Sequence, residues 1–346
     1  MRLPAEWEKH EATWLALPSA RNPDNWYEKS ATIRWSFAEI ARALSRREKV
    51  RFTVNSPAEQ ERATAWLRDA DAVMANVEFF PFPTFWGWLR DCAPQFVRRD
   101  GRLAAVDFQF NGWAYLDDWQ DDNALPQRLA EKFSLPRTVA RWRGAPWVLE
   151  GGAIDGNGEK VLLTTAECLL DQQTQVRNRG ASAADNEQVL REYLGAEQVV
   201  WLGRGLAGDD THGHVDDVCR FVAPRVVVAV NERDVADVNY AALSENQERL
   251  AAARFADGGK LTVITLPAPR PVIYQGRRLP ASYANFYIGN GVVLVPTFND
   301  VADGEALGVL REIFPDREVI GIYARDLVLG GGSIHCLTMQ QPAGDN

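Results

Sequence analysis

The sequence predicts an α/β fold in which one unit, a β-hairpin followed by a helix and a strand, recurs around a central site. Pairs of apolar runs joined by turns such as Asp100-Gly101 indicate the hairpins. Each hairpin is followed by a segment with the apolar period of a helix, and then by another short apolar run. Polar residues also gather at equivalent places beside the first strand of the hairpins.

The first part of the chain predicts alternating strands and helices. A serine, a proline and a glutamate at positions 56, 57 and 59 match an N-cap, a first helical residue and a capping-box partner. The predicted elements are a strand at Glu11–Pro18, a helix within Trp26–Arg47, a strand at Val50–Val54, a helix from Ser56 to about Asp69 and a strand at Val77–Pro81.

Four complete units follow. The predicted hairpins are Ala93–Val97 with Leu103–Phe110, Val148–Ile154 with Lys160–Thr164, Val215–Val222 with Arg225–Val230, and Ala284–Ile288 with Val292–Pro296. The predicted helices and strands after them are Asn123–Phe133 and Thr138–Trp142, Ala184–Leu194 and Val199–Leu202, Leu243–Phe255 and Lys260–Leu266, and Gly304–Phe314 and Glu318–Ile322.

The fifth unit is divided between the two ends of the chain. Its hairpin would pair Ser333–Gln340 with Glu11–Pro18, and the helix and strand after residue 26 would complete it. Pairing the first and last strands closes a ring, which removes exposed sheet edges. The expected result is a fivefold pseudo-symmetric α/β propeller, with residues 1–346 forming a single catalytic domain. An ordinary α+β protein with hairpins in series is the alternative.

Composition narrows the function class. The chain has 346 residues, 46% of them hydrophobic, and a net charge of −9, which argues against nucleic-acid binding. The four cysteines form no CxxC pair, so neither a zinc site nor a disulfide scaffold is indicated. No signal peptide or membrane-spanning run is found. We therefore expect a soluble, cytoplasmic protein, and a homo-oligomer is left open.

A run of three glycines near the C-terminus presents a cysteine. Gly330-Gly331-Gly332 lies between two strand-like runs, Asp326–Leu329 and Ile334–Met339, and the second run contains Cys336. Glycine permits backbone conformations and close approaches that a side chain would block. A cysteine beside such a turn is a candidate nucleophile, whereas a lone cysteine is more often a small buried hydrophobe.

Polar residues from four other places complete a candidate site. In a closed ring, equivalent strand ends converge on the axis, which would bring Asp91, Glu150, His214, Asp216 and Cys336 together. His214 and Asp216 are two residues apart, so on a strand they would face the same side. A metal site is a second interpretation, with ligands drawn from His212, His214, Asp216 and Asp210.

These residue types suit a guanidinium substrate. Two carboxylates, Asp91 and Asp216, can hold the planar cation through charge-assisted hydrogen bonds, while a thiolate attacks its carbon. A histidine can protonate the departing ammonia and then activate water, with Glu150 orienting the imidazole. Trp88 can cover the cation or an apolar substrate stem.

The chain resembles the agmatine deiminases, which belong to the bacterial peptidyl-arginine deiminase family of the guanidine-modifying superfamily. The resemblance is carried by five stretches in family order: residues 3–15 (LPAEWEKHEATWL), 88–91 (WLRD), 149–152 (LEGG), 211–216 (THGHVD) and 330–336 (GGGSIHC).

The resemblance implies the pentein form of the propeller, no metal and no cofactor. It also implies that the small cationic substrate is agmatine, hydrolysed through a covalent cysteine thiouronium. Cys336 would be the nucleophile and His214 the acid and base. Asp91 and Asp216 would be guanidinium ligands, Glu150 the partner of His214, and Asp210 a residue near the substrate. A thiolate between two carboxylates predicts that the cationic substrate assists ionisation of the thiol.

The chain departs from the family pattern at Cys92-Ala93, where the family has Thr-Gly, and at His212, where a small polar residue is usual. Cys92 is interpreted as a packed residue. His335 would face away from Cys336 on a strand and is given no role. Free or peptidyl arginine remain alternative substrates, and Arg90, Arg179 and Arg220 are candidates to bind a carboxylate. An amidinotransferase, or a silent sensor of polyamine-like cations, is also left open.

Overall fold

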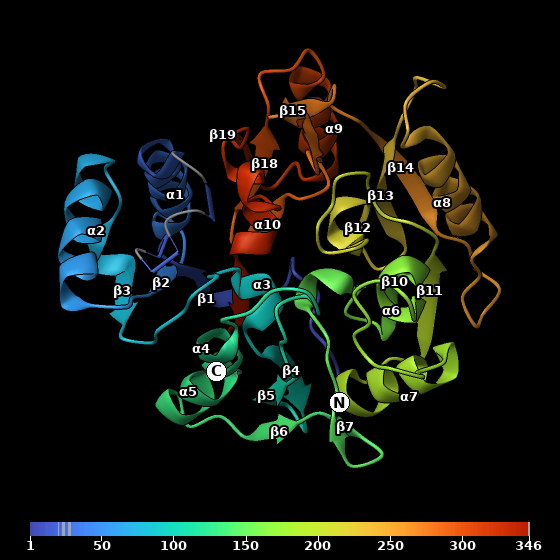
Figure 1. Cartoon of the computed structure of the whole chain (residues 1–346), viewed down its shortest axis with the longest axis horizontal. Coiled ribbons are helices and arrows are strands. Elements are labelled where there is room, and N and C mark those ends of the chain that lie inside the picture. The colour runs from blue at the N-terminus through green and yellow to red at the C-terminus, as the bar shows by residue number, and fades with distance from the viewer. Residues whose placement is uncertain (20, 23–24, 27–28, 345–346) are drawn as a thin grey trace.

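A computed structural model describes residues 1–19, 21–22, 25–26 and 29–344. It is a mixed α/β structure with five sheets of at least three strands (Figure 1). Their strand orders are β20-β1-β2-β3, β4-β5-β6, β9-β10-β11, β12-β13-β14 and β17-β18-β19.

Each of the five sheets follows the predicted unit, because an antiparallel pair is extended on one side by a parallel strand. The strands are β20 (Met339–Pro342), β1 (His10–Ala16), β2 (Lys49–Thr53) and β3 (Val77–Phe80); β4 (Gln95–Arg99), β5 (Arg102–Asp107) and β6 (Arg137–Val139); β9 (Asp155–Gly156), β10 (Val161–Thr165) and β11 (Gln198–Leu202); β12 (Cys219–Ala223), β13 (Val226–Asn231) and β14 (Thr262–Pro267); and β17 (Tyr287–Gly289), β18 (Val292–Thr297) and β19 (Glu318–Tyr323).

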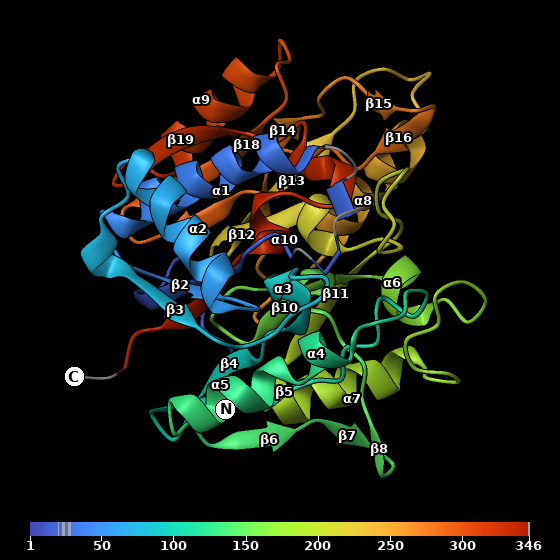
Figure 2. The same ribbon diagram turned by 60° about the vertical axis from the view of Figure 1, so that its left-hand side comes forward.

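A helical segment connects the two parallel strands of each sheet, as expected for parallel neighbours. These segments are α1 (Ser30–Ser45) and α2 (Pro57–Asp69) in the first sheet, α4 (Gln120–Asn123) with α5 (Leu125–Lys132), α6 (Ala166–Leu170) with α7 (Ala183–Leu194), α8 (Tyr240–Ala252), and α9 (Asp303–Ile313). Figure 2 shows α1 and α2 side by side. Two small hairpins, β7 (Arg141–Trp142) with β8 (Ala145–Pro146) and β15 (Val272–Tyr274) with β16 (Arg277–Leu279), lie outside these units.

The divided fifth unit is confirmed. Strand β20 pairs antiparallel with β1, so that Trp14 lies opposite Met339, and β1 pairs in parallel with β2. The Ser56 cap is also confirmed, because its hydroxyl accepts the Glu59 N–H at 3.2 Å. The Glu59 carboxylate reaches the N–H of Asn55 instead of that of Ser56. The start of the helix predicted within Trp26–Arg47 falls partly on residues 27–28, which lie outside the described residues.

The main correction concerns the segments that carry the polar clusters, which are short helical turns and not strands. Asp326–Leu329 and Ile334–Met339 are replaced by a 3₁₀ turn at Leu327–Gly330, by α10 (Ile334–Leu337) and by β20. The predicted strand Val148–Ile154 contains an isolated bridge at Val148 and the 3₁₀ turn η3 (Gly151–Ala153), and the strand β9 begins only after it. The predicted strand Val215–Val222 begins as the 3₁₀ turn η4 (Val215–Asp217) and continues as β12. A single turn lets several neighbouring side chains face one centre, which an alternating strand does not allow.

These turns meet at the centre of the molecule. Helix α3 (Leu89–Cys92) contacts both α10 and η3, and η3 contacts η4. Figure 1 shows α3 and α10 in the middle of the view, with α2, α5, α7, α8 and α9 toward the outside. Within the described residues, no helix is long and apolar enough to cross a membrane. The fold thus gathers residues that are about 245 positions apart in sequence into one place.

Candidate active site

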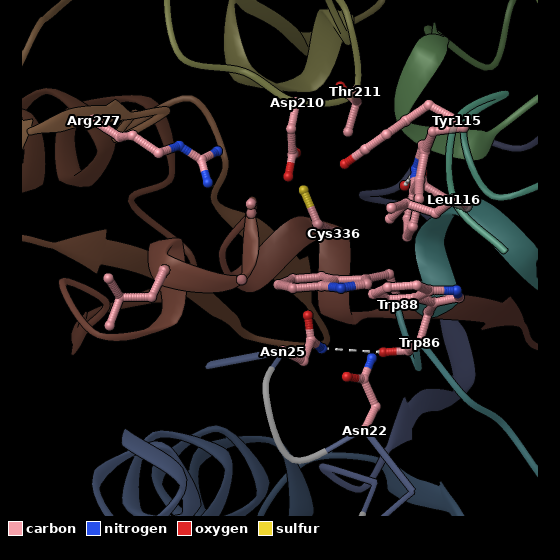
Figure 3. Close-up of a pocket in the computed structure, with 16 residues that line it drawn as sticks. Asn22, Asn25, Trp86, Trp88, Tyr115, Leu116, Asp210, Thr211, Arg277 and Cys336 are labelled. Atoms are coloured by element: carbon pink, nitrogen blue, oxygen red, sulfur yellow. Dashed lines mark hydrogen bonds between the residues drawn. The ribbon is translucent and has the colours of Figure 1, made fainter. Parts of the chain in front are cut away.

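The predicted nucleophile lies in a cavity of about 380 Å³ (Figure 3). Cys336 is on the single turn of α10 and is 5% exposed. The glycine run bends over it: a Cβ on Gly332 would lie 2.9 Å from the Cys336 sulfur, and a Cβ on Gly330 would lie 2.7 Å from the Trp88 ring. Gly331 has a φ of +97°, which a side chain would strain. The glycines therefore give the cavity a backbone wall beside the sulfur.

One predicted carboxylate lies beside the sulfur, and the other lines its cavity. Asp216 Oδ2 lies 3.6 Å from Cys336 Sγ, and Asp91 lines the same cavity. Asp91 accepts hydrogen bonds from the Trp113 indole at 2.8 Å and from the Gly152 N–H at 2.9 Å. Asp216 Oδ1 is buried and has no hydrogen-bond partner among the described residues. One acceptor next to the sulfur is thus available to a cationic ligand.

The two carboxyl groups differ in their electrostatics. Burial raises the pKa of Asp91 to about 6, against the positive charge of His214 and with the added repulsion of Asp216 and Glu150. For Asp216, burial is opposed by the hydrogen bond and charge of His335, and the pKa lies below its ordinary value. The Cys336 pKa is raised well above its ordinary value by burial and then by the charges of Asp216, Asp217 and Asp91. This agrees with the expectation that the free thiol is protonated until a cation arrives.

His214 lies beside Asp91 and Glu150. Its Nδ1 is 3.7 Å from Asp91 Oδ1, and its Nε2 is 4.0 Å from Glu150 Oε2. Both ring nitrogens are buried without a hydrogen-bond partner among the described residues. Burial disfavours the imidazolium, but the charge of Asp91, the neighbouring Cys168 and Glu150 raise the pKa of His214 well above its ordinary value. The ring is therefore available as a proton donor with no fixed partner.

Glu150 is adjacent to His214, but it is anchored by a residue that the sequence patterns do not single out. Arg177 donates from Nε to Glu150 Oε1 at 3.0 Å, and its other nitrogens donate to the carbonyl oxygens of Gln175 and Thr211. Both side chains are fully buried. Arg177 thereby ties the glutamate to the loop that leads to His214.

His335, to which the sequence assigned no role, contacts one of the two predicted guanidinium ligands. On the turn of α10, its Nδ1 lies 2.6 Å from Asp216 Oδ2 and its Nε2 lies 2.8 Å from Glu6 Oε2. Glu6 also bonds Arg90 at 3.1 Å and the Ile288 N–H at 2.8 Å. The assumption of a strand at Ile334–Met339 placed His335 on the wrong side of the chain.

Asn285 is a second missed residue. Its Nδ2 donates to the Cys336 sulfur at 3.1 Å, and its Oδ1 accepts from the Ser333 hydroxyl at 2.8 Å and the His335 N–H at 3.0 Å. One amide thus fixes the start of α10 and contacts the nucleophile. The sequence signal was a polar residue within the apolar run Tyr283–Ile288.

The remaining predicted residues also line the cavity. Trp88 and Asp210 both line it, and Figure 3 shows the Asp210 carboxylate and the Cys336 sulfur pointing toward one another. Burial and then the charge of Asp209 raise the pKa of Asp210 to about 6. Cys92 is buried and donates to the Trp88 carbonyl at 3.3 Å, in agreement with a packed residue.

The arginines considered for a substrate carboxylate do not line this cavity. Arg90 and Arg220 are buried against Glu6, and Arg179 lines a different pocket. Among the described residues, Arg277 is the basic side chain that lines the cavity.

The metal interpretation from the sequence is not supported in the form considered. His212 Nε2 lies 2.7 Å from Asp171, away from His214. Within the described residues, metal-ligand spacing is found for a different set, Glu150, Cys168 and His214.

Comparison with known proteins agrees with this geometry. A family model described as Porphyromonas-type peptidyl-arginine deiminase matches residues 2–342. The chain is 38% identical to an agmatine deiminase of Pseudomonas aeruginosa over 99% of this chain and 95% of that protein, and 37% identical to one of Medicago truncatula over 99% and 96%.

Comparison with solved structures also finds agmatine deiminases. A cysteine-to-serine variant of the C. jejuni agmatine deiminase with substrate bound matches with a TM-score of 0.87 at 31% identity, over 99% of this chain and 96% of that one. The Enterococcus faecalis agmatine deiminase matches with a TM-score of 0.88 at 31% identity, over 99% and 95%. An amidinotransferase of saxitoxin biosynthesis from Microseira wollei matches in fold alone, with a TM-score of 0.53 at 12% identity over 99% and 98%.

Proposed function

This chain belongs to the Porphyromonas-type peptidyl-arginine deiminase family, and we propose that it is an agmatine deiminase. The reaction is the hydrolysis of agmatine to N-carbamoylputrescine and ammonia. The observation that carries the proposal is a buried cysteine that shares its cavity with the carboxylate of Asp91 and lies 3.6 Å from the buried carboxylate of Asp216. A guanidinium needs acceptors on two sides and a nucleophile facing its carbon, and these three residues supply both.

In the proposed mechanism, Asp91 and Asp216 accept hydrogen bonds from the guanidinium nitrogens. The unpartnered Asp216 Oδ1 supports this role, because a buried acceptor without a donor is costly unless a ligand supplies one. The bound cation neutralises the carboxylates and so favours ionisation of the Cys336 thiol, whose proton passes to solvent and is recovered when the sulfur leaves the carbon. The sulfur then forms a bond to the guanidinium carbon.

His214 serves as acid and then as base. The imidazolium gives its proton to one nitrogen of the adduct, the carbon–nitrogen bond breaks, and ammonia leaves a thiouronium on Cys336. A water molecule next gives a proton to the neutral imidazole and adds to the carbon. The carbon–sulfur bond breaks, and the guanidinium and water have become a ureido group and ammonium. Glu150, held by Arg177, favours the imidazolium from 4.0 Å.

The substrate tail fits the outer part of the cavity. Agmatine carries a second cation, a primary ammonium, at the end of a four-carbon chain. We place this ammonium near Asp210 and the carbon chain against Trp88. With a pKa of about 6, Asp210 is ionised at neutral pH and can pair with an ammonium.

We further infer that residues 1–346 form one catalytic domain, a fivefold pseudo-symmetric propeller of the pentein type. The repetition of one sheet type five times along the described residues supports this. The proposed chemistry uses no cofactor. All four cysteines are free thiols, which suits a reducing compartment such as the cytoplasm.

The test is ammonia release and ureido-product formation from agmatine, measured beside free arginine and a peptide ending in arginine. We expect turnover of agmatine and its loss in Cys336→Ala. Asn285→Asp serves as a companion variant, because a carboxylate beside the sulfur should slow the reaction without removing the nucleophile. Turnover of none of the three compounds would overturn the proposal and favour an amidinotransferase or a cation sensor.

Arginine is the second candidate substrate because of Arg277. This guanidinium lines the cavity that contains Asp210 and could meet a substrate carboxylate. Preferential turnover of free or peptidyl arginine, lost in Arg277→Gln, would keep the chemistry and change the substrate.

A further inference from the structure

A second thiol faces the proposed acid and base. Cys168 lies on α6, and its Sγ, an oxygen of Glu150 and a ring nitrogen of His214 all lie within 4.8 Å of one another. The exposed fraction is 0% for Glu150 and His214 and 1% for Cys168. The proposed deiminase mechanism gives this thiol no part, although it belongs to the most enclosed region of the site.

The backbone holds the cysteine and the histidine together. Thr165 caps α6, and its hydroxyl oxygen accepts the Cys168 N–H at 3.1 Å. The same hydroxyl donates to the carbonyl of Gly213, next to His214, at 2.5 Å. One threonine therefore fixes the spacing of the two segments that carry the sulfur and the imidazole. Arg177 fixes Glu150 from the other side.

The polar atoms that face this space are unsatisfied. Glu150 Oε2 and both nitrogens of His214 are buried without a hydrogen-bond partner among the described residues. Such atoms are unusual in a folded protein and call for an unseen partner. They occur here beside a sulfur, so that an imidazole, a carboxylate and a thiol face one small volume.

A thiolate, an imidazole and a carboxylate are the ligand types that zinc prefers, and three protein ligands with an open fourth position are typical of accessible zinc sites. A bound Zn²⁺ would be balanced by the Cys168 thiolate and the Glu150 carboxylate, with the thiol proton released to solvent. Asp91 and Asp210, which line the cavity, and the buried Asp216 would attract a cation toward this region.

We propose that Glu150, Cys168 and His214 form an inhibitory binding site for a zinc ion. The ion takes the nitrogen lone pair of His214, so the imidazole can neither donate nor accept the protons of the reaction. The inhibition rests on the proposed deiminase function, whereas the binding itself does not.

Binding is tested first without any activity, in the Cys336→Ala variant, which removes the thiol of the proposed nucleophile. Co²⁺ serves as the probe because a thiolate ligand gives it a strong near-ultraviolet charge-transfer absorption. We expect one equivalent of Co²⁺ to produce this band and Zn²⁺ to displace it. The band should disappear in Cys336→Ala/Cys168→Ser and in Cys336→Ala/Cys168→Ala, and remain in the matched control Cys336→Ala/Cys219→Ser, which alters a buried cysteine outside the cluster.

Absence of the band while Cys168 is present, or its persistence in both Cys168 variants, would overturn the proposal. Circular dichroism of each variant shows whether it is folded, and two different replacements of Cys168 guard against the failure of one.

Inhibition is tested in the otherwise unchanged enzyme. We expect Zn²⁺ to inhibit ammonia release reversibly, with recovery on addition of a chelator, and the inhibition constant to rise at least about tenfold in Cys168→Ser. Equal inhibition of Cys168→Ser and the unchanged enzyme would mean that zinc acts elsewhere, for example at Cys336, and would overturn the proposal. If no guanidino substrate is turned over, the proposed function fails while the cobalt measurement still decides the metal site.

Discussion

Two buried histidines at the centre of the molecule have opposite surroundings. His335 has a carboxylate on each ring nitrogen, at 2.6 Å from Asp216 and 2.8 Å from Glu6. His214, equally buried, has no hydrogen-bond partner within the described residues, and its nearest carboxylates are 3.7 and 4.0 Å away. The difference indicates that one half of the site is built to hold a fixed geometry and the other half to move protons. Four predictions test this comparison.

The largest effect is expected at the unpartnered histidine. His214→Gln should lower kcat by about 10³-fold, because general acid and base catalysis contributes about 10²–10⁴-fold. The midpoint of thermal unfolding should fall only modestly, because no hydrogen bond is lost, although the imidazolium charge that faces Asp91 and Glu150 is removed. Ammonia release and calorimetry measure the two quantities. Marked destabilisation with retained activity would reverse the roles assigned to the two histidines.

A substitution beside the hydrogen-bonded His335 should mainly lower the stability of the fold. Glu6→Gln breaks a buried ion pair with Arg90 and leaves His335 without one carboxylate, so unfolding free energy should fall by about 3 kcal/mol. Burial opposes ionisation of Glu6, but Arg220, His335 and Arg90 hold its pKa well below its ordinary value. This stability is therefore present above pH about 4.5 and is lost as the pH falls further.

Denaturant unfolding of Glu6→Gln at pH 7 makes the measurement, and Glu8→Gln is the matched control. Glu8 pairs with Arg2 near the surface, where an ion pair contributes about 0–1 kcal/mol. Similar losses in the two variants would contradict a special role for Glu6.

Asp91 and Asp216 are both proposed to bind the guanidinium, but replacing them should change the stability of the fold in opposite directions. The folded-state pKa of Asp91 is raised to about 6, so its ionisation costs stability above pH 4, and the cost is complete above pH 6. Asp91→Asn should therefore stabilise the fold at pH 8 by about 1–3 kcal/mol while lowering turnover. Asp216→Asn should destabilise it, because the Asp216 pKa is lowered by His335.

The same pKa gives the activity a pH dependence. Protonation of Asp91 removes a negative charge from the cation site, so kcat/KM should fall as the pH drops through about 6. Thermal unfolding and initial rates between pH 5 and 8 measure both effects. A gain in stability for Asp216→Asn at pH 8 would contradict the predicted difference between the two carboxylates.

The smallest effect is expected at Asp210. Asp210→Asn should raise the KM for agmatine by about tenfold, or about 1.4 kcal/mol, through loss of the charge that meets the ammonium. The kcat should change little. Butylguanidine, which lacks the ammonium, is the control substrate, and its KM should be unaffected. An equal rise for both substrates would place Asp210 against the guanidinium and not against the tail.

The repeated unit was predictable because it depends on local patterns. Apolar period, turn glycines and the Ser56 cap specify hairpins and helices from neighbouring residues alone. The residues Asp91, Glu150, His214, Asp216 and Cys336 were found because each lies beside the start of a repeated hairpin.

The missed residues depend on contacts that no local pattern encodes. The apolar period of Ile334–Met339 favours a strand, but Asn285, some 50 positions earlier, binds the backbone of the segment and holds it as a turn. That turn brings His335 to Asp216. Glu6 and Arg177 likewise act across the molecule, through partners far away in sequence. Tertiary contacts override propensity in such short segments.

The absence of a side chain at Gly152 limits how the site can evolve. A Cβ at this position would lie 2.5 Å from His214 Nδ1 and 2.9 Å from Asp91 Oδ1, so even alanine would displace both. Position 152 therefore tolerates no side chain, and new specificities in descendants of this chain, natural or selected in the laboratory, should arise at exposed residues that line the cavity, such as Tyr115 and Arg277. A directed-evolution library restricted to these exposed residues should therefore yield more active members than one of equal size that also varies position 152.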